Sequence, residues 1–147
     1  MYSKEENQRL KREFWVSFAN KYPRKWILYN TKIKDFSFKF YVENTKAQVQ
    51  IDIESRNDIK RIQYFEKLES LKSILEEEFI SDLVFEKNFS LENGKVISRI
   101  WVEKLNVSVS NPKYWDEIFD FYNEKMHALE MFYLEYGDYI RDLEMNT

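Results

Sequence analysis

Two consecutive stretches of strict apolar–polar alternation constrain the fold of this chain more than any other feature of its sequence. Every second residue is apolar in residues 36–42 and again in residues 47–53, with a short polar break between them. Because the side chains of a strand point alternately to its two faces, this pattern predicts an antiparallel pair with one buried face. A connection of two or four residues places Phe40 opposite Val49, whereas a three-residue loop would set apolar residues against polar ones.

A second antiparallel pair is predicted around Asn93-Gly94, the strongest short hairpin signal in the chain. A type I′ turn needs positive φ at both central residues, and Asn-Gly is the dipeptide that best supplies it. Folding about this turn gives one mostly apolar face and one mostly polar face. The expected pairs are Leu91–Val96, Phe89–Ser98, Lys87–Ile100 and Phe85–Val102.

Helix signals surround these two hairpins. Ser3 to Glu6 form a capping box, Asn57-Asp58 precedes a second helix with Ile59 and Ile62 on its buried side, and Asn111-Pro112 opens the last helix. The expected helices span about residues 3–20, 57–79 and 112–143, and a short strand is expected at Trp26–Tyr29.

The resulting order is α-β-β-β-α-β-β-α. It predicts an α+β fold in which helices pack on one face of an antiparallel sheet of about five strands. We expect residues 1–147 to form one such domain.

The last predicted helix carries a strict heptad of apolar residues. Unbroken from residue 112 to residue 143 it would be about 48 Å long, longer than the roughly 38 Å diameter of a compact domain of this length. We expect it to stop at Gly137 and restart at Asp138. The alternative is an overhanging helix that forms a homodimer through the heptad seam. The seam consists of Trp115, Phe119, Tyr122, Met126, Leu129, Tyr133, Tyr136, Ile140 and Leu143.

Composition excludes several kinds of chemistry. The chain has no cysteine, one histidine (His127) and two glycines, which rules out thiol chemistry and cysteine-ligated zinc and leaves too few glycines for a phosphate-binding loop. We therefore expect no cofactor and no metal. Neither a signal peptide nor a membrane span is recognisable, so we expect a cytoplasmic protein without a membrane partner.

Charge is distributed unevenly along the chain. Residues 1–61 carry 14 Lys+Arg against 8 Asp+Glu, and residues 62–147 carry 9 against 18. The basic first part, including Lys-Arg clusters at residues 9–12 and 21–25, can be a nucleic-acid surface. Neutralisation of the two parts across one folded surface is the interpretation that we favour, because no basic run is long enough to form a polybasic arm.

The polar face of the sheet holds the candidate binding residues. If the two hairpins lie side by side, Lys39, Tyr41, Arg99 and Trp101 share that face. Aromatic and arginine side chains dominate binding surfaces for proteins and for single-stranded nucleic acid. We expect a non-catalytic binding module with a protein or nucleic-acid partner; a second small core around Trp101 is the open alternative.

The same face also holds carboxylates. Asp52, Glu54 and Glu86 could hold a divalent metal for phosphodiester cleavage, so a metal-dependent nuclease, or an accessory domain of a restriction-type DNA-processing system, is the alternative function. The acid-x-Lys pattern of restriction-type nucleases occurs here at Asp58–Lys60, at the start of a helix instead of on a strand.

Several short motifs recur in order and resemble a prokaryotic family, the domain of unknown function 4268 family. They are Leu10-Lys-Arg-Glu-Phe-Trp15, Trp26-x-x-Tyr29 before the Phe-x-Phe-x-Phe strand, Ile51-Asp-Ile53, Leu83-Val-Phe-Glu86, Ser98-Arg-Ile100 and Asn-Pro-x-x-Trp115. Members occur alone or at the C-terminus of longer, restriction-endonuclease-like proteins. The resemblance implies a bacterial or archaeal protein associated with DNA-processing systems, and it supplies no catalytic residues.

Overall fold

The computed structural model describes residues 2–145, which form an α+β fold, as predicted. Within these residues the antiparallel sheet has four strands, not the five expected. The elements are α1 (Lys4–Lys21), β1 (Phe36–Val42), β2 (Lys46–Ile53), α2 (Asp58–Ser70), α3 (Lys72–Ile74), the π-helix η1 (Leu75–Phe79), β3 (Val84–Ser90), β4 (Val96–Leu105), the 3-10 helix η2 (Pro112–Tyr114) and α4 (Trp115–Met145).

The strand expected at Trp26–Tyr29 does not form. The backbone N–H of Ile27 donates to the carboxylate of Glu130 at 2.7 Å, so a side chain of α4 takes the place of a neighbouring strand. Leu28 has a φ of 42°, which turns the chain out of the extended conformation. The segment therefore passes beside β1 as a loop that touches it through one backbone hydrogen bond, from Phe38 to Leu28 (3.0 Å).

The two hairpins form one sheet with the order β1-β2-β4-β3, and all neighbours are antiparallel. Phe40 lies opposite Val49, which confirms the register predicted for the first hairpin. The central pairing joins β2 to β4 and places Ile51 opposite Ile100. The apolar faces of both hairpins consequently lie on one side of the sheet.

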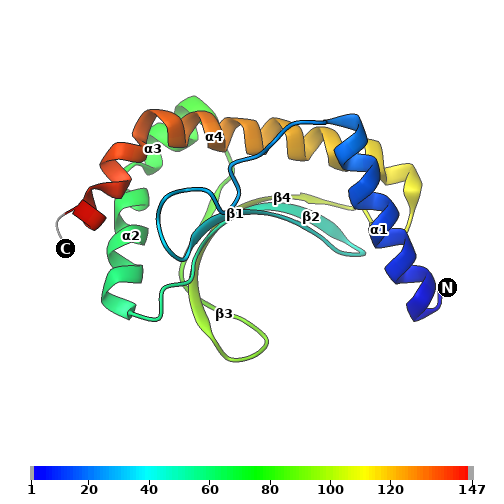
Figure 1. Cartoon of the computed structure of the whole chain (residues 1–147), viewed down its shortest axis with the longest axis horizontal. Helices are drawn as coiled ribbons and strands as arrows, with labels where there is room; N and C mark the ends of the chain where they lie inside the picture. Colours follow the sequence, from blue (N-terminus) through cyan, green and yellow to red (C-terminus); the bar gives the residue numbers. More distant parts are fainter. Residues whose placement is uncertain (1, 146–147) are drawn as a thin grey trace.

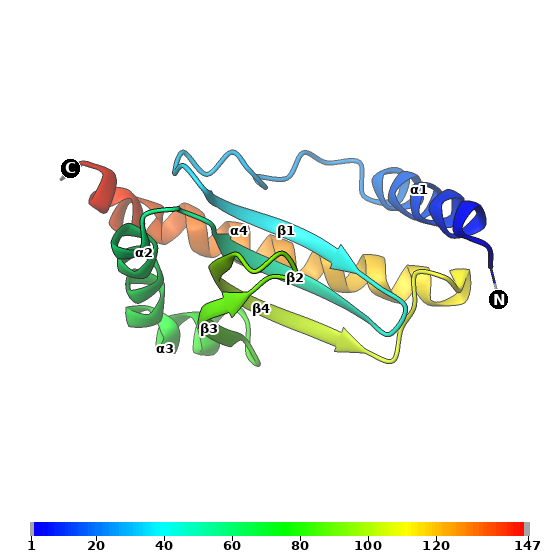
Figure 2. The same ribbon diagram turned by 90° about the horizontal axis from the view of Figure 1, so that it is seen from below.

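The sheet is strongly curved, with its convex side toward α4 (Figure 1). The core lies between this convex side and the helices, and includes Phe38, Val49, Ile51 and Ile100, each at most 1% exposed. Figure 2 shows the opposite, concave side of the sheet, and no helix within residues 2–145 lies across it. The helices α1 and α2 flank the sheet near opposite ends of α4.

The second hairpin differs from its prediction at the turn. The N–H of Gly94 donates to the carbonyl of Leu91 at 2.9 Å, and the N–H of Leu91 donates to the carbonyl of Lys95 at 2.8 Å. Gly94 has a φ of 85°, whereas Asn93 is not among the residues with positive φ. The loop is thus the three-residue type that ends in a left-handed glycine, and the predicted two-residue type I′ turn is wrong.

A β-bulge between Glu86 and Phe89 shifts the register of this hairpin a second time. Arg61 of α2 is 3% exposed and donates to the carbonyl of Lys87 at 2.6 Å and to the hydroxyl of Ser98 at 2.7 Å. A buried arginine therefore binds the backbone carbonyl of the bulge, which lacks a ladder partner.

The second helix also departs from its prediction. It buries Arg61, Tyr64, Phe65 and Leu68, whereas Ile59, expected on the buried side, is 73% exposed. The helix breaks at Leu71, and the chain continues through α3 and the π-helix η1 to Phe79. Because α2 buries Arg61, its buried face is rotated away from the purely apolar stripe that the sequence predicted.

The last helix, α4, is continuous through Gly137, so the predicted stop there is wrong. Its 31 residues give a length of about 46 Å. The length fits because the molecule is elongated along the curved sheet (Figure 1), whereas the prediction assumed a sphere. No helix within residues 2–145 is long and apolar enough to cross a membrane.

The heptad seam of α4 packs on the sheet of its own chain. Phe119, Tyr122, Met126, Leu129 and Tyr133 belong to the buried core cluster, as does Ile140. The hydroxyl of Tyr122 donates to the carbonyl of Tyr41 at 2.6 Å, and burial raises the pKa of this tyrosine. The seam that suggested a homodimer is thus filled by intramolecular contacts.

Candidate functional site

The polar face predicted for the sheet is its concave side, and the four predicted binding residues lie there together. Lys39 of β1 lies opposite Gln50 of β2, which lies opposite Trp101 of β4. Tyr41 and Arg99 follow on the same face of their strands. A hollow of about 380 Å³ opens on this side, lined by Tyr41, Glu43, Lys46, Gln48, Gln50, Phe89, Ser90, Leu91, Glu92, Arg99 and Trp101.

The floor of the concave side is an ion-pair cluster around Asp52, which is 0% exposed. Arg99 donates to both carboxylate oxygens of Asp52, from Nε at 2.7 Å and from Nη2 at 2.9 Å. Lys39 lies 3.1 Å from Asp52 and 3.0 Å from Glu54. A carboxylate this deeply buried needs such partners, because an isolated buried charge is strongly unfavourable.

The pKa of Lys39 reflects the closeness of its two carboxylate partners. Burial alone would lower the pKa of Lys39, but the charge of Asp52 and the hydrogen bond to Glu54 outweigh it and raise the pKa above its ordinary value. Lys39 and Arg99 therefore hold carboxylates of their own chain. They position the surface instead of standing ready to bind a phosphate.

The aromatic wall of the hollow comes from β3 and β4. The Trp101 and Phe89 rings meet edge to face with centroids 5.7 Å apart, and the Arg99 guanidinium lies 4.5 Å from the centre of the Phe89 ring. Trp101 is half-buried in this contact. The sequence predicted Phe89 opposite Ser98 on the helix-facing side. The three-residue turn shifts the register by one residue and places Phe89 opposite Ile97, on the concave side, and the β-bulge returns Phe85 to the helix-facing side.

The opposite wall is Tyr41, which is 38% exposed. Its hydroxyl donates to Glu43 at 2.7 Å. This hydrogen bond, followed by burial and the charges of Glu43 and Glu92, raises the pKa of Tyr41. Hydrogen bonds from Tyr41 and Thr45 lower the pKa of Glu43. Glu92 of the β3–β4 turn and Tyr41 of β1 line the same hollow, so the turn faces β1 across it.

Two amides that the sequence placed on a solvated face are buried here. Gln50 is 2% exposed and Gln48 7% exposed. Gln50 donates to Gln48 at 2.7 Å, and Gln48 donates to Glu103 at 2.8 Å. Their position on a central strand is the signal that predicts such burial, because flanking strands cover both sides of β2.

The hollow offers little positive charge to a phosphate. Its lining contains two cations, Lys46 and Arg99, and two carboxylates, Glu43 and Glu92. Asp52 already holds Arg99, which leaves Lys46 beside two carboxylates. Nucleic-acid binding depends on cations that neutralise phosphates, so this charge favours a protein partner.

The carboxylates of the alternative nuclease hypothesis do not assemble into a metal site. Both oxygens of Asp52 are held by Arg99, and Glu86 is the neighbour of Arg99 on β3. Among the residues that the structure describes, no group of three or more His, Cys, Asp or Glu could hold a metal ion. The carboxylate of Asp58 lies instead 3.6 Å from Arg61 of its own helix.

Part of the charge asymmetry of the chain is neutralised across the fold, which is the interpretation favoured above. Lys21 pairs with Asp120 at 2.9 Å, and Arg24 pairs with Glu130. The ring of His127 lies 3.4 Å from Arg24, at the exposed edge of this contact. The basic cluster at residues 21–25 is therefore engaged by acids of α4.

Comparison with known proteins assigns the chain to one family. A family model described as a domain of unknown function (DUF4268) matches residues 10–137. The chain belongs to that family, as the order of its short motifs indicated. Searches of curated proteins and of solved structures found no match.

Proposed function

We propose that this protein is a non-catalytic, cytoplasmic binding module that docks a segment of a partner protein on the concave side of its sheet. The observation that carries the proposal is the hollow of about 380 Å³ between Tyr41 and the β3–β4 turn. Arg99, which lines the hollow, is held by both carboxylate oxygens of the buried Asp52, so this part of the surface is formed before a partner arrives. Pre-organisation of this kind lowers the entropy lost on binding.

The chemistry of the hollow indicates the chemistry of the partner. Trp101, Phe89 and Tyr41 offer aromatic faces, the kind of side chain that dominates protein interfaces. Glu43 and Glu92 contribute two carboxylates to the lining, against Lys46 and an Arg99 that Asp52 already neutralises. A partner segment that presents basic and aromatic side chains satisfies both features, through ion pairs with these carboxylates and cation–π contacts at the wall.

The family resemblance adds a setting for this role. If the chain works within a prokaryotic restriction-type system, the docked segment would belong to another component of that system. The chain itself supplies a surface: the carboxylate of Asp52 that the nuclease alternative requires is occupied by Arg99 and Lys39.

Calorimetry with three probes tests the proposal: a short peptide of alternating Arg and Tyr, a matched peptide of alternating Glu and Tyr, and oligothymidine. We expect binding of the first peptide alone, weakened about tenfold or more by Trp101→Ala, as for an aromatic hot spot. Tyr29→Ala is the matched control, because Tyr29 is 73% exposed and lies outside the hollow. Oligothymidine as the preferred probe, or equal effects of the two substitutions, would overturn the proposal.

A further inference from the structure

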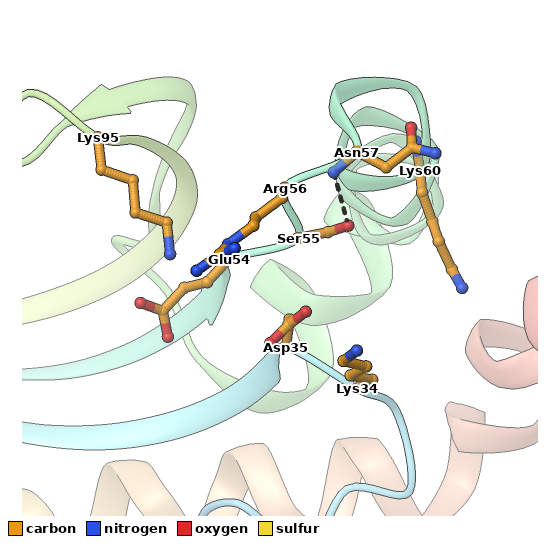
Figure 3. A pocket seen from close by; sticks show the side chains of 8 residues that line it. All are labelled: Lys34, Asp35, Glu54, Ser55, Arg56, Asn57, Lys60 and Lys95. Atoms are coloured by element: carbon orange, nitrogen blue, oxygen red, sulfur yellow. Dashed lines mark hydrogen bonds between the residues drawn. The ribbon is translucent and has the colours of Figure 1, made fainter.

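A second hollow, of about 610 Å³, lies at the end of the sheet where β1 begins and β2 ends (Figure 3). Three separate parts of the chain build it: the loop before β1, the link from β2 into α2, and the β3–β4 turn. It is lined by Lys34, Asp35, Glu54, Ser55, Arg56, Asn57, Lys60 and Lys95.

The lining is rich in positive charge that the fold does not neutralise. Four cations and two carboxylates line the hollow. Glu54, one of these carboxylates, already pairs with Lys39 at 3.0 Å, within the cluster of Asp52 and Arg99 that balances two cations with two carboxylates. Lys34, Arg56 and Lys95 therefore have Asp35 as the one remaining carboxylate in the described lining, while Lys60 is engaged in an interaction of its own.

Three of these cations stand apart from the rest of the fold. Within residues 2–145, Lys34, Arg56 and Lys95 make no ion pair, whereas Lys21 and Arg24 each pair with an acid of α4. Figure 3 shows Arg56 and Lys95 extending toward each other from opposite sides of the hollow. Uncompensated like charges held close together lower the stability of a fold unless an anion joins them.

The walls of the hollow are fixed by short-range hydrogen bonds. The N–H of Glu54 donates to the carbonyl of Asp35 at 2.7 Å, which ties the loop before β1 to the end of β2. The side chain of Ser55 accepts from the N–H of Asn57 at 3.2 Å, and Asn57 accepts from the N–H of Lys60 at 3.1 Å. Because the side chain of Asn57 already caps α2, the attraction for an anion comes from the cationic side chains of Lys34, Arg56 and Lys95, which make no ion pair within the described residues.

We propose that this hollow binds the phosphate chain of a small polyphosphate. Its size is within the roughly 300–1,000 Å³ of small-molecule sites. The described lining contains no aromatic side chain on which a base could stack, so phosphate is the group recognised. Lys34, Arg56 and Lys95 around one carboxylate suit two linked phosphates, with Arg56 as the group able to bind phosphate oxygens bidentately.

Calorimetric titration of the whole protein with pyrophosphate tests the proposal. We expect binding that weakens as salt is added and that falls about tenfold or more in Arg56→Gln and in Lys95→Gln. The matched control is Arg12→Gln, which removes the same charge from the exposed surface of α1. Unfolding temperatures measured with and without pyrophosphate confirm that each variant folds and report binding independently.

Asp35→Asn should increase the affinity for pyrophosphate, which a substitution that only disturbed the fold would not do. Asp35 has a φ of 61°, a conformation that Asn adopts readily, and loss of its charge should tighten pyrophosphate binding severalfold. Comparing tripolyphosphate with ATP separates a free polyphosphate from a nucleotide. Absence of pyrophosphate binding, equal weakening by Arg12→Gln, or binding of oligonucleotides alone would overturn the proposal.

Discussion

The convex side of the sheet buries Phe38 and Ile51 beneath α4, whereas the concave side buries Asp52 and Gln50 with no helix across it in the described residues. On the convex side, burial removes apolar surface from water and is favourable by itself. On the concave side, burial of polar groups is unfavourable until each finds a partner, and the Asp52 cluster and the amides provide them. The first side holds the fold together, and the second presents an ordered polar surface.

The largest loss of stability should follow removal of an aromatic ring from the core on the convex side. Phe38→Ala deletes a ring that is 1% exposed and packs against Tyr133 at 5.4 Å. We expect a loss of about 3–5 kcal/mol in the free energy of unfolding, measured by urea denaturation. Tyr29→Ala, at a side chain that is 73% exposed, is the control and should change it by about 0.5 kcal/mol or less.

The next largest effect should come from the buried charge of the concave side. Asp52→Asn leaves Arg99 and Lys39 without their shared carboxylate, and we expect a loss of about 3 kcal/mol in the same assay. This value is the low end of the roughly 3–5 kcal/mol expected when a buried ion pair loses one partner, because the side chains of Arg99 and Lys39 retain 15% and 25% exposure. Adding Arg99→Gln should then cost much less than it does alone. Fully additive losses would show that the cluster does not act as a unit.

The smallest expected effect is a pH dependence from Lys39. Its folded-state pKa lies above 10.5 because the charge of Asp52 and the hydrogen bond to Glu54 outweigh burial. A raised pKa contributes stability below the unfolded value, and that contribution is lost as the pH rises through the folded value. Urea denaturation near pH 9 and near pH 11 should show a steeper alkaline loss in the wild type than in Lys39→Arg, whose charge persists. Parallel losses would assign the alkaline change to other groups, such as the tyrosines.

The parts of the fold that local patterns determine were predictable. Alternation together with a connection of two or four residues determines that Phe40 faces Val49, because a shift by one residue would expose the whole apolar set. The second hairpin was not predictable in the same way. Arg61 of α2 binds the carbonyl of Lys87 in the bulge. A contact between segments this far apart cannot be predicted from the local sequence pattern.

The candidate site, too, was predictable only in part. Strand parity was enough to place Lys39, Tyr41, Arg99 and Trp101 on one face. The ion pairs of these residues could not be predicted. Arg99 pairs with Asp52 only because their two strands are neighbours in the sheet. The basic hollow was missed for a related reason: its cations are distributed from residue 34 to residue 95, and only the folded chain brings them together.

Chemical-shift mapping with the alternating Arg and Tyr peptide tests the central claim most directly. We expect the perturbed signals to belong to the concave side, led by the Trp101 indole N–H and the side-chain amides of Gln48 and Gln50. Signals of Met131 and Leu134, which are exposed on α4 at 46% and 72%, should stay unchanged. Perturbations centred on α4, with the Trp101 signal unmoved, would contradict it.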